Sequence, residues 1–506
     1  MFKGHPKGLI PAAVANMGER FGFYTMMAIL SLFLMSKFGL DETGSGWIYS
    51  TFYFSIYGMA FFGGLIADKL RNYKGTIFTG LIMMSFGYLF LSIPTNVTQD
   101  NKTFLIIMTC LALFTISFGN GLFKGNLQAL VGQMYDNPQY ASKRDSGFSL
   151  FYMFINIGAI FAPFIAPAVR NWWLGRSGYT YDANLPALCH EYIEKGANMG
   201  ADAMAKLETL ANGASSVSIA NLGEFSSKYL DTFNTGFHYS FAVAILAMLI
   251  SMVVYMKNKK GFPDPASKQQ KSSEELAEIE MPLAEVKQRI YALLAVFGVV
   301  IFFWFSFHQN GLTLTFFAKD YTLLKLGSWN ITAEMFQAAN PFFVVFLTPV
   351  VMGFFGWLDA KGKEPSTPAK IAIGMGIAAL GFVVMTLGSF GLPNLDEVRA
   401  MGELPAAQKV TPFLLIGTYL ILTIAELFIS PLGISFVSKV APPKLQGLMQ
   451  GLWLLATGLG NQLLIIGAIF YKNIPIWATW SVFVVACFIS MFTMLFMLKW
   501  LERVSK

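Results

Sequence analysis

Charged residues and cysteines are both scarce in this sequence. Asp, Glu, Lys and Arg make up 13% of its 506 residues, about half of the roughly 25% that a soluble protein carries. With 55% hydrophobic residues, the composition excludes an ordinary water-soluble chain. The cysteines are Cys110, Cys189 and Cys487. Two of them lie in apolar segments and one lies alone in a loop, so neither a disulfide framework nor a metal motif is indicated.

Long apolar stretches occupy most of the chain. About 20 apolar residues in a helix span a bilayer. The first stretch follows a short basic segment, lacks a small-residue cleavage site and carries Glu19, so we expect a spanning helix there and not a signal peptide. In all we predict twelve spans, near residues 8–37, 46–69, 75–94, 103–133, 145–169, 237–257, 289–318, 332–358, 369–391, 411–440, 446–471 and 476–500.

Basic residues alternate between successive loops. One set of loops contains Lys69 and Arg71, or Lys361 and Lys363, whereas the other set is richer in acids. By the positive-inside rule the basic set is cytoplasmic. This predicts a multi-pass protein of the plasma (inner) membrane with both termini in the cytoplasm. Because the positive charge alternates from loop to loop, the net charge of +7 does not indicate nucleic-acid binding.

Two long loops divide the predicted spans. Residues 258–288 contain prolines and a Ser/Lys/Glu-rich run, and we expect a cytoplasmic linker between two six-helix bundles. The N-terminal bundle comprises residues 1–169 and 237–257, and the C-terminal bundle comprises residues 289–506. Residues 170–236 form an extracytoplasmic insert between the fifth and sixth spans. The insert is either a cap or gate, or simple decoration.

A weak repeat relates the two halves. Gly64 precedes Asp68 by about a turn at the end of the second span, and Gly356 precedes Asp359 at the end of the eighth. Asp68 is a predicted gating residue, which would pair with a base or cap a neighbouring helix on the cytoplasmic side. The alternative is an ordinary interfacial acid.

Few ionisable residues are expected inside the spans. They are Glu19 and Arg20 in the first, Lys124 in the fourth, His308 in the seventh and Glu426 in the tenth. A charge in hydrocarbon costs about 3 kcal/mol on insertion scales, so these residues should face a partner or a water-filled cavity. Spans 1, 4, 7 and 10 lead the four three-helix units of a twelve-helix carrier built from repeats. The pattern predicts a carrier with a central charged cavity.

The first span contains a specific motif, Asn16-Met-Gly-Glu19-Arg20-Phe21-Gly-Phe23-Tyr24. It resembles the signature Glu-x-x-Glu-Arg-Phe-x-Tyr-Tyr of the proton-dependent oligopeptide transporter family. Further blocks that are similar to this family follow in order: Phe118-Gly-Asn120-Gly121-Leu-Phe-Lys124, Phe151-Tyr152-Met-Phe-Ile-Asn156, Phe303-Trp304 with Gln309, Asn340-Pro341, Glu426-Leu-Phe-Ile-Ser430-Pro431 and Ala441-Pro442-Pro443-Lys444.

The resemblance implies an all-α membrane protein with a major facilitator fold that takes up di- and tripeptides together with protons. It implies that Lys124 and Glu426 face the cavity from opposite halves and that Glu426 receives the peptide amino terminus. Asn156 and Asn340 would hydrogen-bond the peptide backbone, or else link helices to one another. Four aromatic residues would line side-chain pockets, with Ser430 nearby: Tyr24, Tyr57, Trp304 and Trp453.

The sequence departs from the family pattern at four positions, which are Asn16, Phe23, Met27 and His308. In the family, an arginine and an acid stand at the last two of these positions and resemble an outer ion pair whose protonation is linked to opening. Both are absent here, so neither is left as an unpaired buried charge. The residue that binds the outer proton in this chain is therefore not identified by the family pattern.

Other groups could carry the coupled proton. Glu19 with Arg20, Glu426 and His308 are the candidates, and protons are the only coupling ion expected, with no cofactor and no metal. Histidine titrates near neutral pH without large tuning. His308 is equally well interpreted as a neutral hydrogen-bonding residue.

Three functions other than peptide uptake are compatible with parts of the sequence. A membrane-embedded enzyme is disfavoured because the spans contain no paired aspartates, metal ligands or nucleophile–base motif. A nutrient sensor that binds but does not transport, and a carrier of another small anion or amino-acid-like solute, remain as alternatives. The expected partners are peptide, protons and lipid, and the expected state is a monomer.

Overall fold

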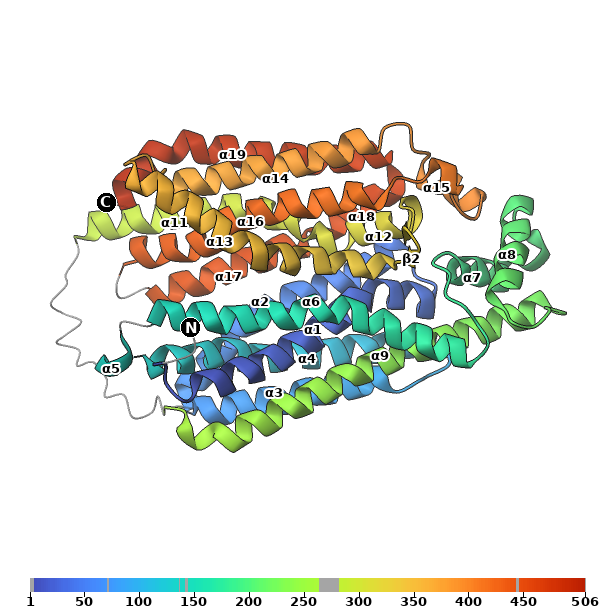
Figure 1. Ribbon diagram of the computed structural model, residues 1–506, viewed down its shortest axis with the longest axis horizontal. Helices are drawn as coiled ribbons and strands as arrows, with labels where there is room; N and C mark the ends of the chain where they lie inside the picture. Colours follow the sequence, from blue (N-terminus) through green and yellow to red (C-terminus); the bar gives the residue numbers. More distant parts are fainter. Residues whose placement is uncertain are drawn as a thin grey trace.

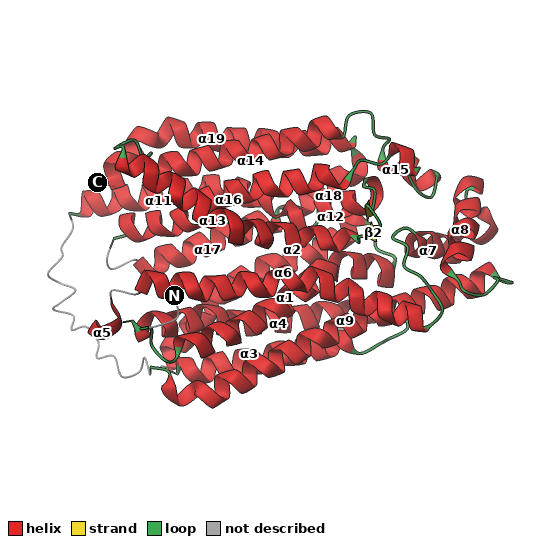
Figure 2. Ribbon diagram, in the orientation of Figure 1, coloured by secondary structure: helices red, strands yellow, loops and turns green. Residues whose placement is uncertain are grey.

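The computed structural model describes residues 4–70, 72–135, 137–141, 144–263, 282–442 and 446–505. This part of the chain is almost entirely helical (Figure 2). Within it, twelve helices are long and apolar enough to cross a membrane. The predicted all-α membrane fold with twelve spans is confirmed. The middle of the predicted linker, residues 264–281, lies outside the described residues.

The N-terminal half is a bundle built around its first helix, which packs against the fourth, fifth and sixth spans. Small residues bring neighbouring backbones together, because a Cβ on Gly80 would lie 2.5 Å from the carbonyl oxygen of Gly119. The helices of this half are α1 (Leu9–Phe38), α2 (Glu42–Leu70), α3 (Tyr73–Ser92), α4 (Lys102–Met134), the short α5 (Pro138–Ala141), α6 (Arg144–Arg176) and α9 (Leu222–Asn258).

The C-terminal half repeats this arrangement, with two of its spans interrupted. The seventh span changes to a 3-10 turn at His308, so that this residue lies at a break in the helix. The elements are α11 (Leu283–Phe307), η4 (His308–Gly311), α12 (Thr313–Tyr321), the strands β1 (Lys325–Leu326) and β2 (Trp329–Asn330), η5 (Ala333–Ala338), α13 (Ala339–Ala360), α14 (Thr367–Gly388), α15 (Leu395–Ala400), η6 (Ala406–Gln408), α16 (Pro412–Val440), α17 (Gln446–Gln462), α18 (Leu464–Asn473) and α19 (Ile476–Ser505).

The insert contains α7 (Leu185–Lys195), η1 (Gly196–Asn198) and α8 (Ala201–Ala214). The flanking helices extend into it further than their apolar stretches predict, since α6 ends at Arg176 and α9 begins at Leu222. The side chain of Asn221 accepts hydrogen bonds from the backbone N–H groups of Gly223 (2.9 Å) and Glu224 (3.1 Å). This N-cap stabilises a helix start that hydropathy does not reveal.

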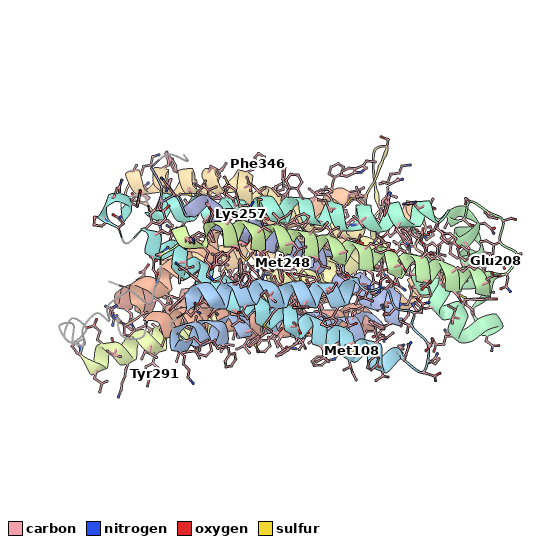
Figure 3. The ribbon with its side chains drawn as sticks, turned by 90° about the horizontal axis from the view of Figure 1, so that it is seen from below. Met108, Glu208, Met248, Lys257, Tyr291 and Phe346 are labelled. Carbon is pink, nitrogen blue, oxygen red and sulfur yellow. The ribbon has the colours of Figure 1, made fainter. Side chains whose placement is uncertain are left out.

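Both termini lie toward one end of the bundle, and the insert with α15 lies at the other (Figure 1). We call these ends the terminus side and the insert side. The two halves meet where α2 packs against α17 and α18, and where α6 packs against α13 and η5. Apolar side chains such as Met108 and Phe346 point outward from the bundle (Figure 3), and both are exposed. This apolar outer surface suits a bilayer.

Candidate functional site

Glu19 and Arg20 form a buried polar cluster within the N-terminal half. Arg20 donates from Nε to Glu19 Oε2 (2.5 Å) and from Nη2 to Oε1 (2.6 Å). Asn120 of α4 donates to the same Oε1 (2.7 Å), and the guanidinium lies 4.7 Å from the ring centre of Phe23. The glutamate charge is therefore fully compensated, as a buried charge requires.

Lys124 of α4 lies over an aromatic ring that points toward the other half. Its Nζ is 4.9 Å from the ring centre of Tyr57, a cation–π distance. Tyr57 borders α17, because a Cβ on Gly458 would lie 3.3 Å from the Tyr57 Cβ. Among the described residues, no carboxylate lies within ion-pair distance of Lys124.

Glu426 of α16 is held by a neighbouring helix of the C-terminal half. Asn340, at the start of α13, donates to Glu426 Oε2 (2.8 Å) and to Thr423 Oγ1 (3.1 Å). The carboxylate also acts electrostatically on Tyr24 and Tyr57 of the other half. Its position is thus fixed by an amide, while no ion pair to it occurs within the described ranges.

Lys124 therefore contacts Tyr57 within the N-terminal half, and Glu426 of the C-terminal half lies within electrostatic range of the same tyrosine. They do not form an ion pair with each other in this structure. Two opposite charges, each lacking a counter-ion in the described part of the chain, remain available to a molecule that carries both signs.

His308 lies at the break in the seventh span, close to the same region. Its Nδ1 lies 2.5 Å from Asn461 Oδ1, and because a carbonyl oxygen only accepts, Nδ1 donates. The imidazole stacks on Trp304 at 4.8 Å between ring centres and lies 4.9 Å from the ring centre of Tyr53 of α2. It also interacts electrostatically with Lys124. His308 thus links both halves.

The other predicted residues take more local positions. Asn156 donates to the backbone oxygen of Tyr152 in its own helix (3.1 Å). Trp453 is buried against Phe297, at 6.0 Å between ring centres, and against Gly433, where no side chain would fit. Ser430 lies one turn beyond Glu426 on α16 and is half-buried.

The predicted gating role of Asp68 stays a prediction. Asp68 falls in the last turns of α2, and its side chain lies outside the described part of the structure.

Sequence reasoning missed several charged residues that join the halves on the insert side. The fully buried pair Arg170–Glu334 links α6 to η5. Further pairs that join the N-terminal half or the insert to the C-terminal half are Glu42–Arg399, Asp41–Lys472 (2.5 Å) and Lys206–Glu403 (3.1 Å).

The expectation of only about five ionisable residues inside the spans is therefore wrong. Glu334 and His238 both lie inside predicted spans and are buried. Both residues stand among apolar residues in the sequence, and this pattern could have identified them. A cation, Lys37, accompanies His238 with its Nζ 2.5 Å from Nε2.

A cavity of about 750 Å³ also lies on the insert side. It is enclosed by the insert, the ends of α1 and α2, and the C-terminal half. Its lining includes Arg170, His190 and Arg399 but neither Lys124 nor Glu426. It is therefore separate from the region around Tyr57.

Twelve spanning helices in two halves, with Lys124 in one half and Glu426 in the other, define a membrane transporter with the major facilitator fold. A family model described as the POT family matches residues 74–192 and 266–478. The chain belongs to this family, as the motifs of the first span and those after it predicted.

Relatives and solved structures agree with this assignment over nearly the whole chain. Dipeptide and tripeptide permease B of Xenorhabdus bovienii is 26% identical, with 99% of this chain and 96% of that protein covered. Peptide transporter YePEPT of Yersinia enterocolitica is 29% identical, with 91% and 87% covered. A crystal structure of peptide transporter POT in complex with sulfate superposes with a TM-score of 0.73 at 22% identity, covering 100% of this chain and 96% of that one.

Proposed function

We propose that this protein takes up di- and tripeptides by proton symport through alternating access. The observation that carries the proposal is that Lys124 and Glu426 lie on opposite halves, the lysine over Tyr57 and the glutamate within electrostatic range of it, with no ion pair between them. A zwitterionic peptide needs an anion for its ammonium and a cation for its carboxylate. The names of the relatives, which include dipeptide and tripeptide permeases, support the same substrate class.

Each polar residue has a role in this proposal. Glu426, oriented by Asn340, binds the peptide ammonium, and Lys124 binds the carboxylate. The amides of Asn156 and Asn340 hydrogen-bond the peptide backbone. A bound peptide bridges the two halves through its own charges, so it favours the arrangements in which they close around it.

The aromatic residues give the site its tolerance for varied side chains. Tyr24, Tyr57, Trp304 and Trp453 contribute apolar area without demanding a particular hydrogen-bond pattern. Ser430, one turn from Glu426, adds a small polar group to the same wall.

Proton coupling is assigned to Glu19 with Arg20 and to Glu426. His308 is a further candidate. A proton and a peptide ammonium compete for the Glu426 carboxylate. His308 offers a titratable ring between Trp304 and Tyr53. These groups bind protons directly, without a cofactor.

We further propose that the protein resides in the plasma membrane with both termini cytoplasmic and the insert outside. We expect it to work as a monomer, since one chain contains both halves of the site. A related solved structure is described as tetrameric PepTSo2. The oligomeric state of this protein should therefore be measured separately.

Uptake into proteoliposomes tests the proposal. Labelled dialanine should accumulate when an inward proton gradient and an inside-negative voltage are imposed, and unlabelled trialanine should compete. Lys124→Gln, which replaces the cation with a neutral amide, is the comparison variant. Accumulation of 5-aminolevulinic acid without dialanine would indicate an amino-acid-like substrate. Binding of dialanine without accumulation would indicate a sensor.

A further inference from the structure

Among the described residues of the insert side, one link between the halves has both charged side chains fully buried. Arg170 Nη1 donates to Glu334 Oε1, and neither side chain is exposed. In the other links between the bundles, Arg399, Lys472 and Asp41 are between 33% and 41% exposed. Water screens those charges, whereas it cannot screen the buried pair.

The two partners differ in how firmly their own half holds them. Arg170 is surrounded by the rings of Tyr181, Phe237 and Phe233, with ring centres 4.2, 5.0 and 5.2 Å from its guanidinium. Its Nε also donates to Asn171 Oδ1 (3.1 Å). All these groups belong to the N-terminal half or the insert. Arg170 therefore keeps stabilising contacts if Glu334 moves away.

Glu334 has one oxygen that is free to take a proton. Its Oε2 is buried and has no hydrogen-bond partner within the described part of the chain, and the same holds for Arg170 Nη2. Arg170 lines the insert-side cavity of about 750 Å³. That cavity extends to Arg170, the partner of Glu334, and so brings the insert side close to the pair.

The other ionisable groups on elements packed against η5 have partners of their own. Lys319 and Asp320 of α12 pair with each other (3.0 Å), and Asp320 also accepts from Tyr471 (2.9 Å). Lys37, at the end of α1, is bound by Thr95 (2.6 Å) and His238. In α13 the acid Asp359 lies at the opposite end of the helix. Tyr181 of the insert also faces the pair, with its ring centre 4.2 Å from the Arg170 guanidinium.

From this geometry we propose that Glu334 is the outer proton-binding residue of this transporter. A proton from the insert side adds to Glu334 Oε2, converts the carboxylate to a carboxylic acid and removes the ion pair with Arg170. The insert side of the two halves can then separate while Arg170 stays within its aromatic ring cluster. Loss of the proton restores the pair and favours closure. This inference rests on the proposed proton symport.

Distances between spin labels test the conformational part without any substrate. Ser177 at the end of α6 and Ser328 between β1 and β2 are both exposed on the insert side. Ser177→Cys and Ser328→Cys, in a chain with Cys110→Ser, carry the two labels. In the parent the label distance should lengthen as pH falls. In Glu334→Gln it should be long at every pH.

Glu42→Gln is the matched control, because Glu42 is also a buried acid paired across the halves. This variant should keep the pH response of the parent. A parent distance that does not change with pH overturns the proposal, and this holds even if Glu334→Gln fails to fold. A Glu334→Gln protein that keeps the parental pH response overturns it as well.

Transport gives the second readout. In Glu334→Gln the pH-driven accumulation of dialanine should fall by about tenfold or more, because the group that couples transport to protons is gone. Counterflow exchange should continue. Retained pH-driven accumulation contradicts the assignment. If the parent itself transports no dialanine, the proposed function fails, but the label distances still decide whether Glu334 responds to protons.

Discussion

Lys124 and Glu426 lie in different halves of the molecule and do not pair with each other; Lys124 lies over the ring of Tyr57, and Glu426 is within electrostatic range of the same tyrosine. A structural ion pair would bring the ammonium and carboxylate together and would leave nothing for a ligand. The observed arrangement leaves both charges available, and Asn340 orients the acid. The proposed peptide, which carries both charges, would satisfy both residues.

The first prediction concerns the coupling role of Glu19. Glu19→Gln removes the titratable group but keeps an acceptor for Asn120 and Arg20. We expect pH-driven dialanine accumulation to be lost and dialanine counterflow to remain, because exchange needs no net proton movement. Uptake and counterflow are measured in the same proteoliposomes. Loss of both would instead indicate that Glu19 holds Arg20 in place, since removing one partner of a buried pair is strongly destabilising.

His308→Gln separates the two interpretations of this histidine. Glutamine can still form a hydrogen bond with Asn461 but does not titrate. If His308 carries the proton, the pH profile of dialanine uptake flattens while affinity for dialanine stays the same. An unchanged profile assigns His308 a structural role. The coupling then depends on the carboxylates.

The third prediction concerns the reactivity of the cysteines. Burial raises the pKa of the Cys189 thiol to about 12, and thiolates are the reactive form. At pH 7 an apolar maleimide should label Cys110, which is exposed, and leave Cys189 unmodified until the protein unfolds. Mass spectrometry of tryptic peptides reports both sites. Rapid labelling of Cys189 in the folded protein would show that the insert does not pack as described.

The fourth prediction is a pH dependence of insert docking. Burial raises the pKa of Glu403, but hydrogen bonds and charges from Lys409 and Lys206 outweigh it, so the net pKa is lowered. A carboxyl group whose pKa is lowered by folding stabilises the folded protein at pH values above its ordinary pKa of about 4.3. This stabilisation is lost as the pH falls through the pKa of the folded state.

The comparison of parent and Glu403→Gln measures that contribution. The parent should unfold at a higher temperature at pH 7, by an amount that corresponds to at most about 1 kcal/mol for partly exposed pairs. The difference should vanish in acid. A difference that grows as pH falls would have the wrong sign for this ion pair.

The sequence predicted the spans well because each span depends on a local run of apolar residues. Helix ends outside the bilayer were less predictable, since the start of α9 depends on a cap at Asn221 and not on hydropathy. The charged residues of the first, fourth and tenth spans could be found because few other charges surround them. Arg170 and Glu334 were missed as partners because they are 164 positions apart and only the packing of two bundles brings them together.

Calorimetric measurement of ligand binding to the parent and to variants at Lys124 and Glu426 tests the central claim most directly. The parent is titrated with dialanine, N-acetyl-dialanine and dialanine amide, and so are Glu426→Gln and Lys124→Gln. Leaving a peptide charge unpaired in a buried site costs about 2–5 kcal/mol, so each variant should bind dialanine at least about tenfold more weakly. Glu426→Gln should no longer distinguish dialanine from its N-acetyl form, and Lys124→Gln should no longer distinguish it from its amide. Unchanged dialanine affinity in both variants would contradict the account.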